Sequence, residues 1–427
     1  MDTIFALATA RGRAGVAVMR ISGPLAHSAA ARLCTLPPPR VAQLRQITHA
    51  GEVIDQALVL LFEAGRSFTG ELVTELHLHG SVAVVAKISA VLGQMDGLRM
   101  ALPGEFTRRA MENGNLDLTQ VEALADLIDA ESEAQRKQAL KVLSGAIGQK
   151  IAPWRAALIR AAALVEATID FADEDVPVDV VPEVRALLSS VQTEIAGEHL
   201  RTSAAEQIRD GFEVAILGAP NIGKSTLLNA LAQREAAITS EIAGTTRDVI
   251  EVRMDIGGFA VTVLDTAGLR DSMDVVENIG IARALDRAEQ ADLRVFLMQS
   301  ETEVFPIAFR PDDILLLGKG DLMQASAAAV SGKTGAGVDA LLVQIASRLE
   351  QRLAAPSVFS RERHRIALQQ ATSALQQSID ALPRAAVQPE LVAAEVRLAL
   401  YALEGIMGRV DVEDLLGEIF SSFCIGK

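Results

Sequence analysis

The sequence predicts a multidomain fold: a small α+β N-terminal domain, an α-helical central domain, and an α/β domain inserted into the helical one. Two buried strands predict the α/β part, since Val214 to Leu217 runs into a glycine loop and Val261 to Leu264 ends at Asp265. Helical patterning occurs on both sides of this part. Short apolar runs separated by glycine and proline turns come before all of it, which is typical of a small α+β domain.

The loop Gly218-Ala-Pro-Asn-Ile-Gly-Lys-Ser225 has the sequence of a phosphate-binding P-loop. A strand precedes it and a helix follows, so its backbone N–H groups are expected to surround the β-phosphate, with Lys224 at the β and γ oxygens and Ser225 on Mg²⁺. The chain is therefore expected to bind a nucleoside triphosphate. The expected contacts in this loop are Asn221, Ile222, Gly223, Lys224, Ser225 and Thr226.

Two later segments predict the switches of a Ras-like GTPase. Asp265 is expected to hold Mg²⁺ through water, and the amide of Gly268 to meet the γ-phosphate. Gly244-Thr-Thr-Arg-Asp248 lies in a polar loop in which Thr246 is the expected Mg²⁺ ligand. The remaining expected contacts of the two switches are Ser240, Glu241, Ile242, Ala243, Gly244, Thr245, Thr266 and Ala267.

A guanine-reading element is expected after the apolar run Ile314 to Leu317. The Asp321 carboxylate is placed to accept from guanine N1 and N2, with Lys319 beside it and Ser331-Gly332-Lys333 behind the base. The usual motif is Asn-Lys-x-Asp, and Gly318 stands where the asparagine would be. The sequence thus predicts GTP specificity with weakened affinity. Gly318→Asn is expected to tighten binding by roughly 1 kcal/mol if the loop keeps the usual backbone path.

The residue that positions the attacking water is not fixed by the residues alone. Ras-like enzymes use a glutamine after the Asp-x-x-Gly motif, whereas Leu269 at that position has no polar group. The candidates in the segment that follows are Asp271, Asp274 and Glu277. An equally simple interpretation makes all three solvated loop charges.

Composition places the chain among cytoplasmic proteins. The 427 residues carry a net charge of −15, which argues against a broad nucleic-acid surface because affinity for phosphates depends on Lys and Arg. Cys34 and Cys424 are far apart and lack metal-ligand spacing, so neither a disulfide framework nor a zinc site is indicated. A reducing cytosol fits. No secretory signal and no run long enough to span a bilayer is found, so no membrane is expected.

Changes in pattern along the chain predict the domain boundaries. Residues 1–117 are expected to form the N-terminal domain, 118–210 together with 351–427 the helical domain, and 211–350 the inserted domain. Within the helical domain, helices are expected from Leu118, over Pro153 to Ile169, over Val181 to Ile208, and after Pro356. Nucleotide-dependent movement of the insert could then reach the helices at both of its ends.

Two weaker signals have simple structural explanations. Glu75, His77 and His79 alternate along one strand face and could bind a metal, but no further ligand is apparent, and polar residues lining a pocket or solvent are preferred. Cys424 lies between Phe423 and Ile425 and is most simply a small apolar residue, with a reactive thiol as the alternative.

With these motifs in place, the chain closely resembles the tRNA modification GTPases of the MnmE (TrmE) family over its whole length. The segments that carry the resemblance are Asp2-Thr-Ile, Arg20-Ile-Ser-Gly23, Ser67-Phe-Thr-Gly-Glu71, Pro103-Gly-Glu-Phe106, Leu116-Asp-Leu118 and Cys424-Ile-Gly-Lys427. The resemblance implies a folate-binding N-terminal domain that mediates homodimerisation and a flavoprotein partner, MnmG (GidA). The two proteins, as a heterotetramer or larger complex, would add a carboxymethylaminomethyl-type group to carbon 5 of the wobble uridine (position 34) of certain tRNAs. The one-carbon donor would be a tetrahydrofolate derivative, 5,10-methylene- or 5-formyl-tetrahydrofolate.

The resemblance also implies roles for particular residues. It places folate contacts at Arg20 and Glu75, with Lys427 near the same pocket, and Asn115 stands where the family has a lysine. It assigns the water-positioning role to Glu277. A K⁺ site is implied at Asn221, Ser240, Ile242 and Thr245, with Mg²⁺ on Ser225 and Thr246. Such a cation would replace an arginine finger, and hydrolysis would depend on dimerisation of the GTPase domains.

Two other classes of protein share some of these features. A GTPase that assists ribosome assembly has the same nucleotide motifs, but it would need an RNA-binding module, and neither a basic Gly-x-x-Gly module nor a basic tail is present. A folate-dependent transferase with GTP as a structural ligand is the second alternative. The intact Mg²⁺ and switch residues argue against it.

Overall fold

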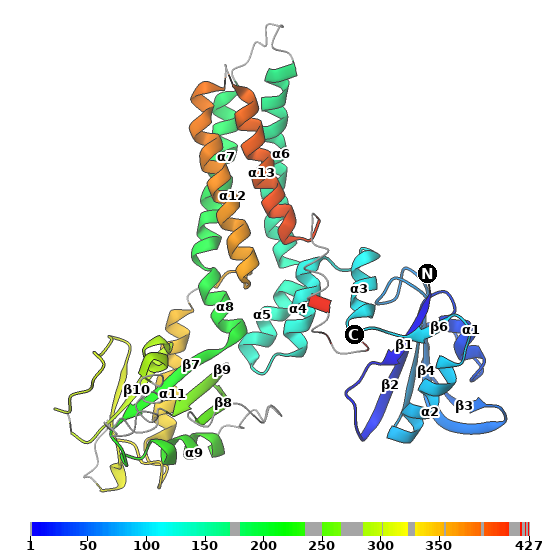
Figure 1. Cartoon of the computed structure of the whole chain (residues 1–427), viewed down its shortest axis with the longest axis horizontal. Helices are drawn as coiled ribbons and strands as arrows, with labels where there is room; N and C mark the ends of the chain where they lie inside the picture. The colour runs from blue at the N-terminus through cyan, green and yellow to red at the C-terminus, as the bar shows by residue number, and fades with distance from the viewer. Residues whose placement is uncertain are drawn as a thin grey trace, which may run out of the picture. The chain divides into compact units, whose positions relative to one another are not determined.

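The computed structural model describes residues 2–170, 180–234, 250–265, 285–300, 302–322, 329–353, 356–385, 388–409, 419–420, 423 and 426. The chain divides into two compact units, one formed by its first 125 residues together with residues 404–427, the other by residues 126–403. They are called here the N-terminal unit and the second unit (Figure 1). Both the fold class predicted from the sequence and its three parts are found in these units. The exact domain boundaries stay a prediction.

The N-terminal unit is built on a mixed sheet with the strand order β3-β4-β5-β2-β1-β6. Only β1 and β6 pair in parallel; the other neighbours are antiparallel. Alternating residues of these strands face helices α1 and α2, and the core between them includes Met19, Ile21, Val59, Leu76 and Leu92. The elements are β1 (Thr3–Leu7), β2 (Ala14–Ser22), α1 (Ala26–Ala31), β3 (Gln43–His49), β4 (Glu52–Phe62), β5 (Val73–Gly80), α2 (Val82–Gly93), β6 (Leu98–Met100) and α3 (Glu105–Glu112).

Helices make up the first part of the second unit. α7 packs against α6 and α12, and these three helices are called the helical layer (Figure 1). The bounds are α4 (Leu118–Ile128, whose last residues enter this unit), α5 (Glu133–Leu143), α6 (Ala146–Asp170), α7 (Val181–Leu200), α8 (Thr202–Asp210), α12 (Glu362–Ala381), η2 (Leu382–Arg384) and α13 (Pro389–Ile406, whose end leaves the unit).

The helices differ from the sequence prediction at three places. The helix expected over Val181 to Ile208 ends at Leu200, and α8 begins after Arg201. Pro153 lies inside α6 instead of at its start. α5 was not predicted, since its polar sequence has a weak apolar stripe. It begins at a capping box in which the Ser132 side chain accepts from the backbone N–H of Gln135 and the Gln135 side chain accepts from that of Ser132.

A five-stranded sheet with the order β11-β10-β7-β9-β8 forms the rest of the second unit and is called the P-loop sheet. β7 is central and parallel to both neighbours, β9 and β10, so their carboxyl ends meet at one edge. The predicted strands at 214–217, 261–265 and 314–317 are confirmed. The elements are β7 (Phe212–Gly218), α9 (Lys224–Arg234), β8 (Ile250–Ile256), β9 (Phe259–Asp265), β10 (Leu293–Met298), β11 (Ile314–Leu317), η1 (Gly320–Leu322) and α11 (Val338–Arg352).

The P-loop sheet is an insertion in the helical part of the chain. The chain leaves the helical layer at Arg201 and returns at Ser357, whose backbone N–H donates to the Arg201 carbonyl at 3.3 Å. A second contact joins the far end of the β8–β9 hairpin to α5, because the N–H of Ala134 donates to the carbonyl of Gly258 at 3.0 Å. Arg253 on β8 also pairs with Glu131 at 2.5 Å.

Candidate functional site

The loop between β7 and α9 lies at the carboxyl edge of the P-loop sheet, where parallel strands present ligands. Gly218 leaves no room for a side chain, because a Cβ there would come within 2.6 Å of the Leu297 carbonyl oxygen on β10. Asn221 and Gly223 adopt φ angles of 62° and 110°. These left-handed residues turn the loop so that it opens into α9.

Lys224 is directed over this loop from the first turn of α9. Its Nζ donates to the carbonyls of Gly218 at 2.9 Å and Ala219 at 3.1 Å. The residue is only 6% exposed, and burial lowers the pKa of its ammonium. A buried cation with its donors fixed at the loop is well suited to bind phosphate oxygens.

The next residue meets the end of β9. Ser225 Oγ donates to Asp265 Oδ2 at 2.6 Å, and Asp265 is 5% exposed. Its other oxygen, Oδ1, is buried and makes no hydrogen bond within the described residues. A hydroxyl beside a buried, unsatisfied carboxylate oxygen is the donor set that Mg²⁺ prefers, so these residues fit that ion.

The predicted base-reading residues lie around one pocket of about 320 Å³. Asp321 Oδ1 accepts from the buried Ser331 Oγ at 2.7 Å, and this hydrogen bond lowers the pKa of the Asp321 carboxyl. An ionised carboxylate here can accept from two N–H donors of a guanine edge. The lining consists of Asn221, Ile222, Gly223, Thr226, Leu227, Leu297, Gly318, Lys319, Asp321, Leu322, Val330, Ser331, Gly332 and Lys333.

The sequence did not indicate how tightly this pocket is closed. A Cβ at Gly332 would lie 2.5 Å from the Leu227 backbone nitrogen. The backing loop therefore lies directly on α9, and a glycine is required for that contact. Leu227, Leu297, Leu322 and Val330 also line the pocket but carry no polar motif, so no sequence signal marked them.

Several predicted site residues lie outside the described residues. They are the proposed catalytic Glu277 and Cys424, the tail residue Lys427, and the switch residues Ser240, Glu241, Ile242, Ala243, Gly244, Thr245, Thr246, Thr266, Ala267 and Gly268. The competing water-positioning candidates Asp271 and Asp274 lie there too.

Three of the predicted folate residues, Arg20, Glu75 and Asn115, lie in the described part of the N-terminal unit. Arg20 on β2 and Glu75 on β5 are register partners, and Arg20 Nε donates to Glu75 Oε1 at 3.0 Å. The Arg20 guanidinium lies 5.6 Å from the ring centres of both Phe68 and Phe106. Asn115 Nδ2 donates to the carbonyls of Ser67 at 3.1 Å and Phe68 at 3.0 Å. The loop that contains Phe68 therefore connects Arg20 to Asn115.

Two cavities of this unit lie away from those residues. One, of about 610 Å³, is lined mainly by small apolar side chains of β1, β2 and α2, and the other, of about 560 Å³, by charged residues of α3. Arg20, Glu75 and Asn115 line neither. Gly426 comes close to the first cavity, since a Cβ there would lie 2.0 Å from the carbonyl oxygen of Leu7, which lines it.

Three motifs that carried the family resemblance meet at Arg109, a residue that the sequence did not single out. Its guanidinium pairs with Asp2 at 2.7 Å, Glu105 at 3.0 Å and Glu71 at 3.2 Å. The side chains of Arg109, Glu71 and Glu105 are each 10% exposed. Asp-Thr-Ile, Ser-Phe-Thr-Gly-Glu and Pro-Gly-Glu-Phe thus share one structural task, which is to hold a largely buried ion-pair network together.

The alternating residues of β5 do not form a metal site. His77 Nε2 lies 3.2 Å from Glu75 Oε2, while His79 Nδ1 lies 2.7 Å from Asp55 on the neighbouring strand β4. Among the described residues no group of three or more metal-ligating side chains occurs. Nor is any helix in the described ranges both long and apolar enough to cross a membrane.

The fold and this pocket define the class of P-loop nucleotide-binding proteins. Comparison with known proteins gives the family. Residues 118–424 match the family model of the MnmE helical domain, and residues 3–115 match that of the GTP-binding protein TrmE N-terminus. The chain belongs to the MnmE family of tRNA modification GTPases, and with it to the GTP hydrolases.

Individual relatives agree with this assignment over the full chain. Proteins called tRNA modification GTPase MnmE from Cereibacter sphaeroides and Roseobacter denitrificans are 59% and 58% identical, with 100% of both chains covered in each comparison. The corresponding protein of Parvibaculum lavamentivorans is 51% identical over the same coverage. A solved structure of Era from Aquifex aeolicus, bound to GDP and tetrafluoroaluminate, is 23% identical over 39% of this chain and 67% of that one, with a TM-score of 0.27. That TM-score is too low to guide an interpretation.

Proposed function

We propose that the protein hydrolyses GTP to drive the modification of tRNA at carbon 5 of the wobble uridine, position 34. The observation that carries the proposal is the hydrogen bond between Ser225 and Asp265 beside the P-loop, at the same edge of the P-loop sheet as the pocket that Asp321 lines. Phosphate-binding and base-binding groups thereby lie on one edge of one sheet. Full-length relatives named tRNA modification GTPase support the tRNA part of the proposal.

In the hydrolytic step, each described residue has a distinct task. Lys224 binds the β and γ oxygens, and Ser225 with Asp265 would hold Mg²⁺, which neutralises charge on the phosphates. Asp321 selects guanine. Outside the described residues, Thr246 is the second proposed Mg²⁺ ligand, and Glu277 orients the attacking water in place of the glutamine that Leu269 replaces.

We also propose that hydrolysis depends on K⁺. Asn221, whose left-handed backbone turns the P-loop, would bind the cation together with Ser240, Ile242 and Thr245. K⁺ supplies the positive charge that an arginine finger gives to other GTPases. Because a shielded cation site requires two GTPase domains face to face, hydrolysis should rise when these domains dimerise.

The modification chemistry is assigned to the N-terminal unit and the C-terminal tail. Arg20, Glu75, Asn115 and Lys427 would bind a tetrahydrofolate derivative, which supplies the one-carbon unit. Cys424 is the proposed reactive thiol of this chemistry. The reaction would require a homodimer of this chain and the flavoprotein MnmG in a heterotetramer or larger complex, all in the cytoplasm. In this scheme the folate-binding domain spans residues 1–117, the helical domain residues 118–210 and 351–427, and the GTPase domain residues 211–350.

Cells that lack the gene provide the decisive test. Mass spectrometry of wobble uridines should show loss of the modified nucleoside, restored by the wild-type gene and not by Ser225→Ala. Unchanged wobble uridines in the deletion strain would refute the tRNA function. In the purified protein, replacing K⁺ by Na⁺ at constant ionic strength should suppress hydrolysis, since the smaller ion fits the same oxygen cage poorly. Equal rates in both salts would exclude the K⁺ site.

A further inference from the structure

The loop after β11 departs from the usual guanine motif at Gly318, and the structure shows what occupies the space of the missing side chain. A Cβ at position 318 would lie 2.7 Å from Ile222 Cγ1 and 3.0 Å from its Cδ1. Ile222 belongs to the P-loop and is 3% exposed. An asparagine at 318 therefore has no room while Ile222 keeps its position.

Ile222 is fixed in that position by its own neighbours. It belongs to the apolar core of the P-loop sheet, together with Leu227 of α9 and Leu297 of β10. Gly318 is held from the other side, because its N–H donates to the Met298 carbonyl at 3.0 Å. Neither partner can withdraw without disturbing the sheet edge, so the close approach is a built feature of the pocket.

We infer that Ile222 and Gly318 form a complementary pair that joins the P-loop to the base-reading loop by apolar contact, in place of the asparagine. This inference rests on the proposed function and names two residues that set its nucleotide affinity. It also reverses the expectation drawn from the sequence: Gly318→Asn alone should weaken nucleotide binding, because the loop does not offer the space that a restored hydrogen bond would need.

A second glycine of the pocket supplies an internal comparison. The Cβ clash at Gly332 is with the backbone of Thr226 and Leu227, which cannot be trimmed by mutation. At Gly318 the two closest atoms belong to the Ile222 side chain, and the Ile222 carbonyl oxygen at 3.0 Å is the only backbone atom among the three nearest. Shortening Ile222 should therefore relieve the clash at Gly318 and leave the clash at Gly332 unchanged.

A double-mutant cycle on the full chain tests the pair. Binding of a fluorescent GDP would be measured for the wild type, Gly318→Asn, Ile222→Ala and the double variant, with ADP as the non-cognate probe. Gly318→Asn should bind GDP about 10-fold more weakly, the effect of overpacking a filled site. The double variant should bind GDP to within about threefold of Ile222→Ala alone.

Two controls make the cycle specific. Gly332→Ala should also weaken binding, and Ile222→Ala should not rescue it. Gly197→Asn adds the same side chain in α7, where an added Cβ would meet no atom within 4 Å apart from the helix's own backbone, and should leave GDP binding unchanged. Thermal unfolding of each variant covers the case in which Gly318→Asn impairs folding, since Gly318→Asn should then lower the melting temperature less in the Ile222→Ala background than in the wild type.

The results separate this inference from the proposed function. Binding of GDP by Gly318→Asn at wild-type strength or tighter would overturn the inference, as would an equal effect of Gly318→Asn on binding and on melting temperature in the wild-type and Ile222→Ala backgrounds. A wild-type protein that binds neither GDP nor GTP would refute the proposed function instead. In that case the melting temperatures of the four proteins still decide whether the pair exists.

Discussion

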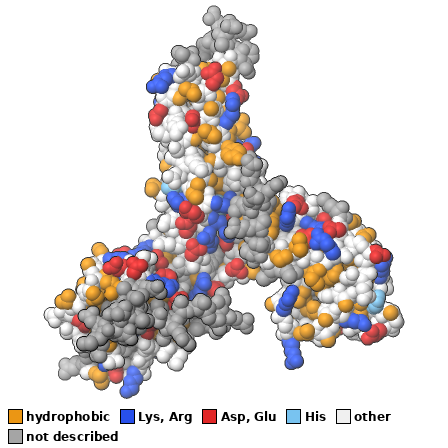
Figure 2. Space-filling view, viewed as in Figure 1, with side chains coloured by type: hydrophobic (Ala, Val, Ile, Leu, Met, Phe, Trp, Pro, Cys, Tyr) orange, Lys and Arg blue, Asp and Glu red, His pale blue; other side chains and the backbone are white. Residues whose placement is uncertain are grey.

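The nucleotide pocket and the N-terminal sheet hold their polar residues by different means. At the P-loop, backbone groups do most of the positioning, as where the carbonyls of Gly218 and Ala219 hold Lys224. In the N-terminal unit, charged side chains hold one another, as where Arg109 contacts Asp2, Glu71 and Glu105. On the face of the molecule that Figure 2 displays, basic and acidic side chains lie interspersed among each other.

This difference separates residues that serve ligand binding from residues that serve stability. A side chain held by backbone can be removed while the loop keeps its path. Removing a member of an ion-pair network leaves buried charges without partners, which costs far more than the pair contributes. Substitutions in the two regions should therefore lower different measured quantities.

The largest effect is expected at Lys224. Lys224→Ala should weaken GTP binding by roughly 10³-fold, because it removes the only P-loop side chain that carries a full positive charge to the phosphates. Burial lowers the pKa of Lys224 in the folded protein, so holding the charged ammonium there costs stability at every pH below that folded pKa. The cost decreases as the pH rises from the folded pKa to the unfolded pKa, and it is absent above the unfolded pKa. The variant should therefore be at least as stable as the wild type at neutral pH, as judged by urea unfolding.

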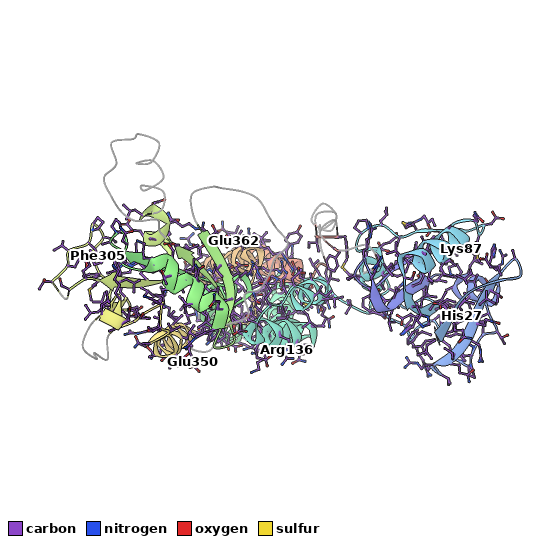
Figure 3. All side chains as sticks on the ribbon, turned by 90° about the horizontal axis from the view of Figure 1, so that it is seen from below. His27, Lys87, Arg136, Phe305, Glu350 and Glu362 are labelled. Atoms are coloured by element: carbon purple, nitrogen blue, oxygen red, sulfur yellow. The ribbon has the colours of Figure 1, made fainter. Side chains whose placement is uncertain are left out.

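Lys87→Ala is the matched control for this substitution. Lys87 lies on α2 of the N-terminal unit and pairs with Glu52 at 3.2 Å (Figure 3). Both side chains are about half exposed or more, so the change should affect neither GTP binding nor stability by more than a few tenths of a kcal/mol. A large loss of stability in Lys224→Ala would break the comparison.

At Arg109 the effect should be on stability. Arg109→Ala should lower the free energy of unfolding by about 3 kcal/mol, because Glu71 would lose its cation while largely buried and Glu105 would keep only Arg99. Arg108→Ala is the control, since Arg108 is 55% exposed and pairs only on the surface with Glu112. The GTPase rate of folded Arg109→Ala should equal that of the wild type.

The same network predicts a pH dependence. Burial raises the pKa of Glu105, but hydrogen bonds from Arg99, the Leu102 backbone and Arg109 outweigh burial, so its folded pKa lies below the ordinary 4.5. A depressed folded pKa gives stability that is present above the unfolded pKa and lost as pH falls through the folded one. The stability gap between wild type and Arg109→Ala should thus narrow below about pH 4.5.

Glu277 tests the catalytic part of the nucleotide site. Glu277→Ala should lower kcat by roughly 10²-fold and leave GTP affinity almost unchanged, the pattern of a lost water-orienting group. Glu350→Ala on α11 (Figure 3), which removes an exposed carboxylate, should leave both quantities unchanged. A near-normal rate in Glu277→Ala would return the choice to Asp271 and Asp274.

The smallest effect is expected at Asn115. Asn115→Ala removes two hydrogen bonds to the Ser67 and Phe68 carbonyls and should lower the free energy of unfolding by about 1 kcal/mol. Asn115→Asp keeps the shape but turns a carboxylate toward the two carbonyl oxygens, so a loss at least as large as that of Asn115→Ala would assign the effect to these bonds. If only Asn115→Ala is destabilised, packing is responsible.

The sequence predicted the P-loop sheet better than the sites built from side chains. The P-loop glycines and Lys224 occur at fixed spacing along the chain, since a strand, a loop and a helix impose that spacing locally. Arg109 and Asp2 are 107 residues apart, and only the folded sheet brings them together. The contact between Ile222 and Gly318 could not be predicted for a similar reason. The sequence shows that the asparagine is missing, but it does not show which side chain fills its place.

The closed junction between Arg201 and Ser357 has a consequence for how the chain is assembled. With respect to the helical layer, the segment between Arg201 and Ser357 is one long loop whose two ends are joined by a hydrogen bond. Loop-closure entropy grows only with the logarithm of length, about 0.6 kcal/mol for each doubling, so the size of the insert scarcely affects the pairing of α7 with α12. The nucleotide-binding part could thus lengthen, shorten or change its loops during evolution while the helices that carry it kept their packing.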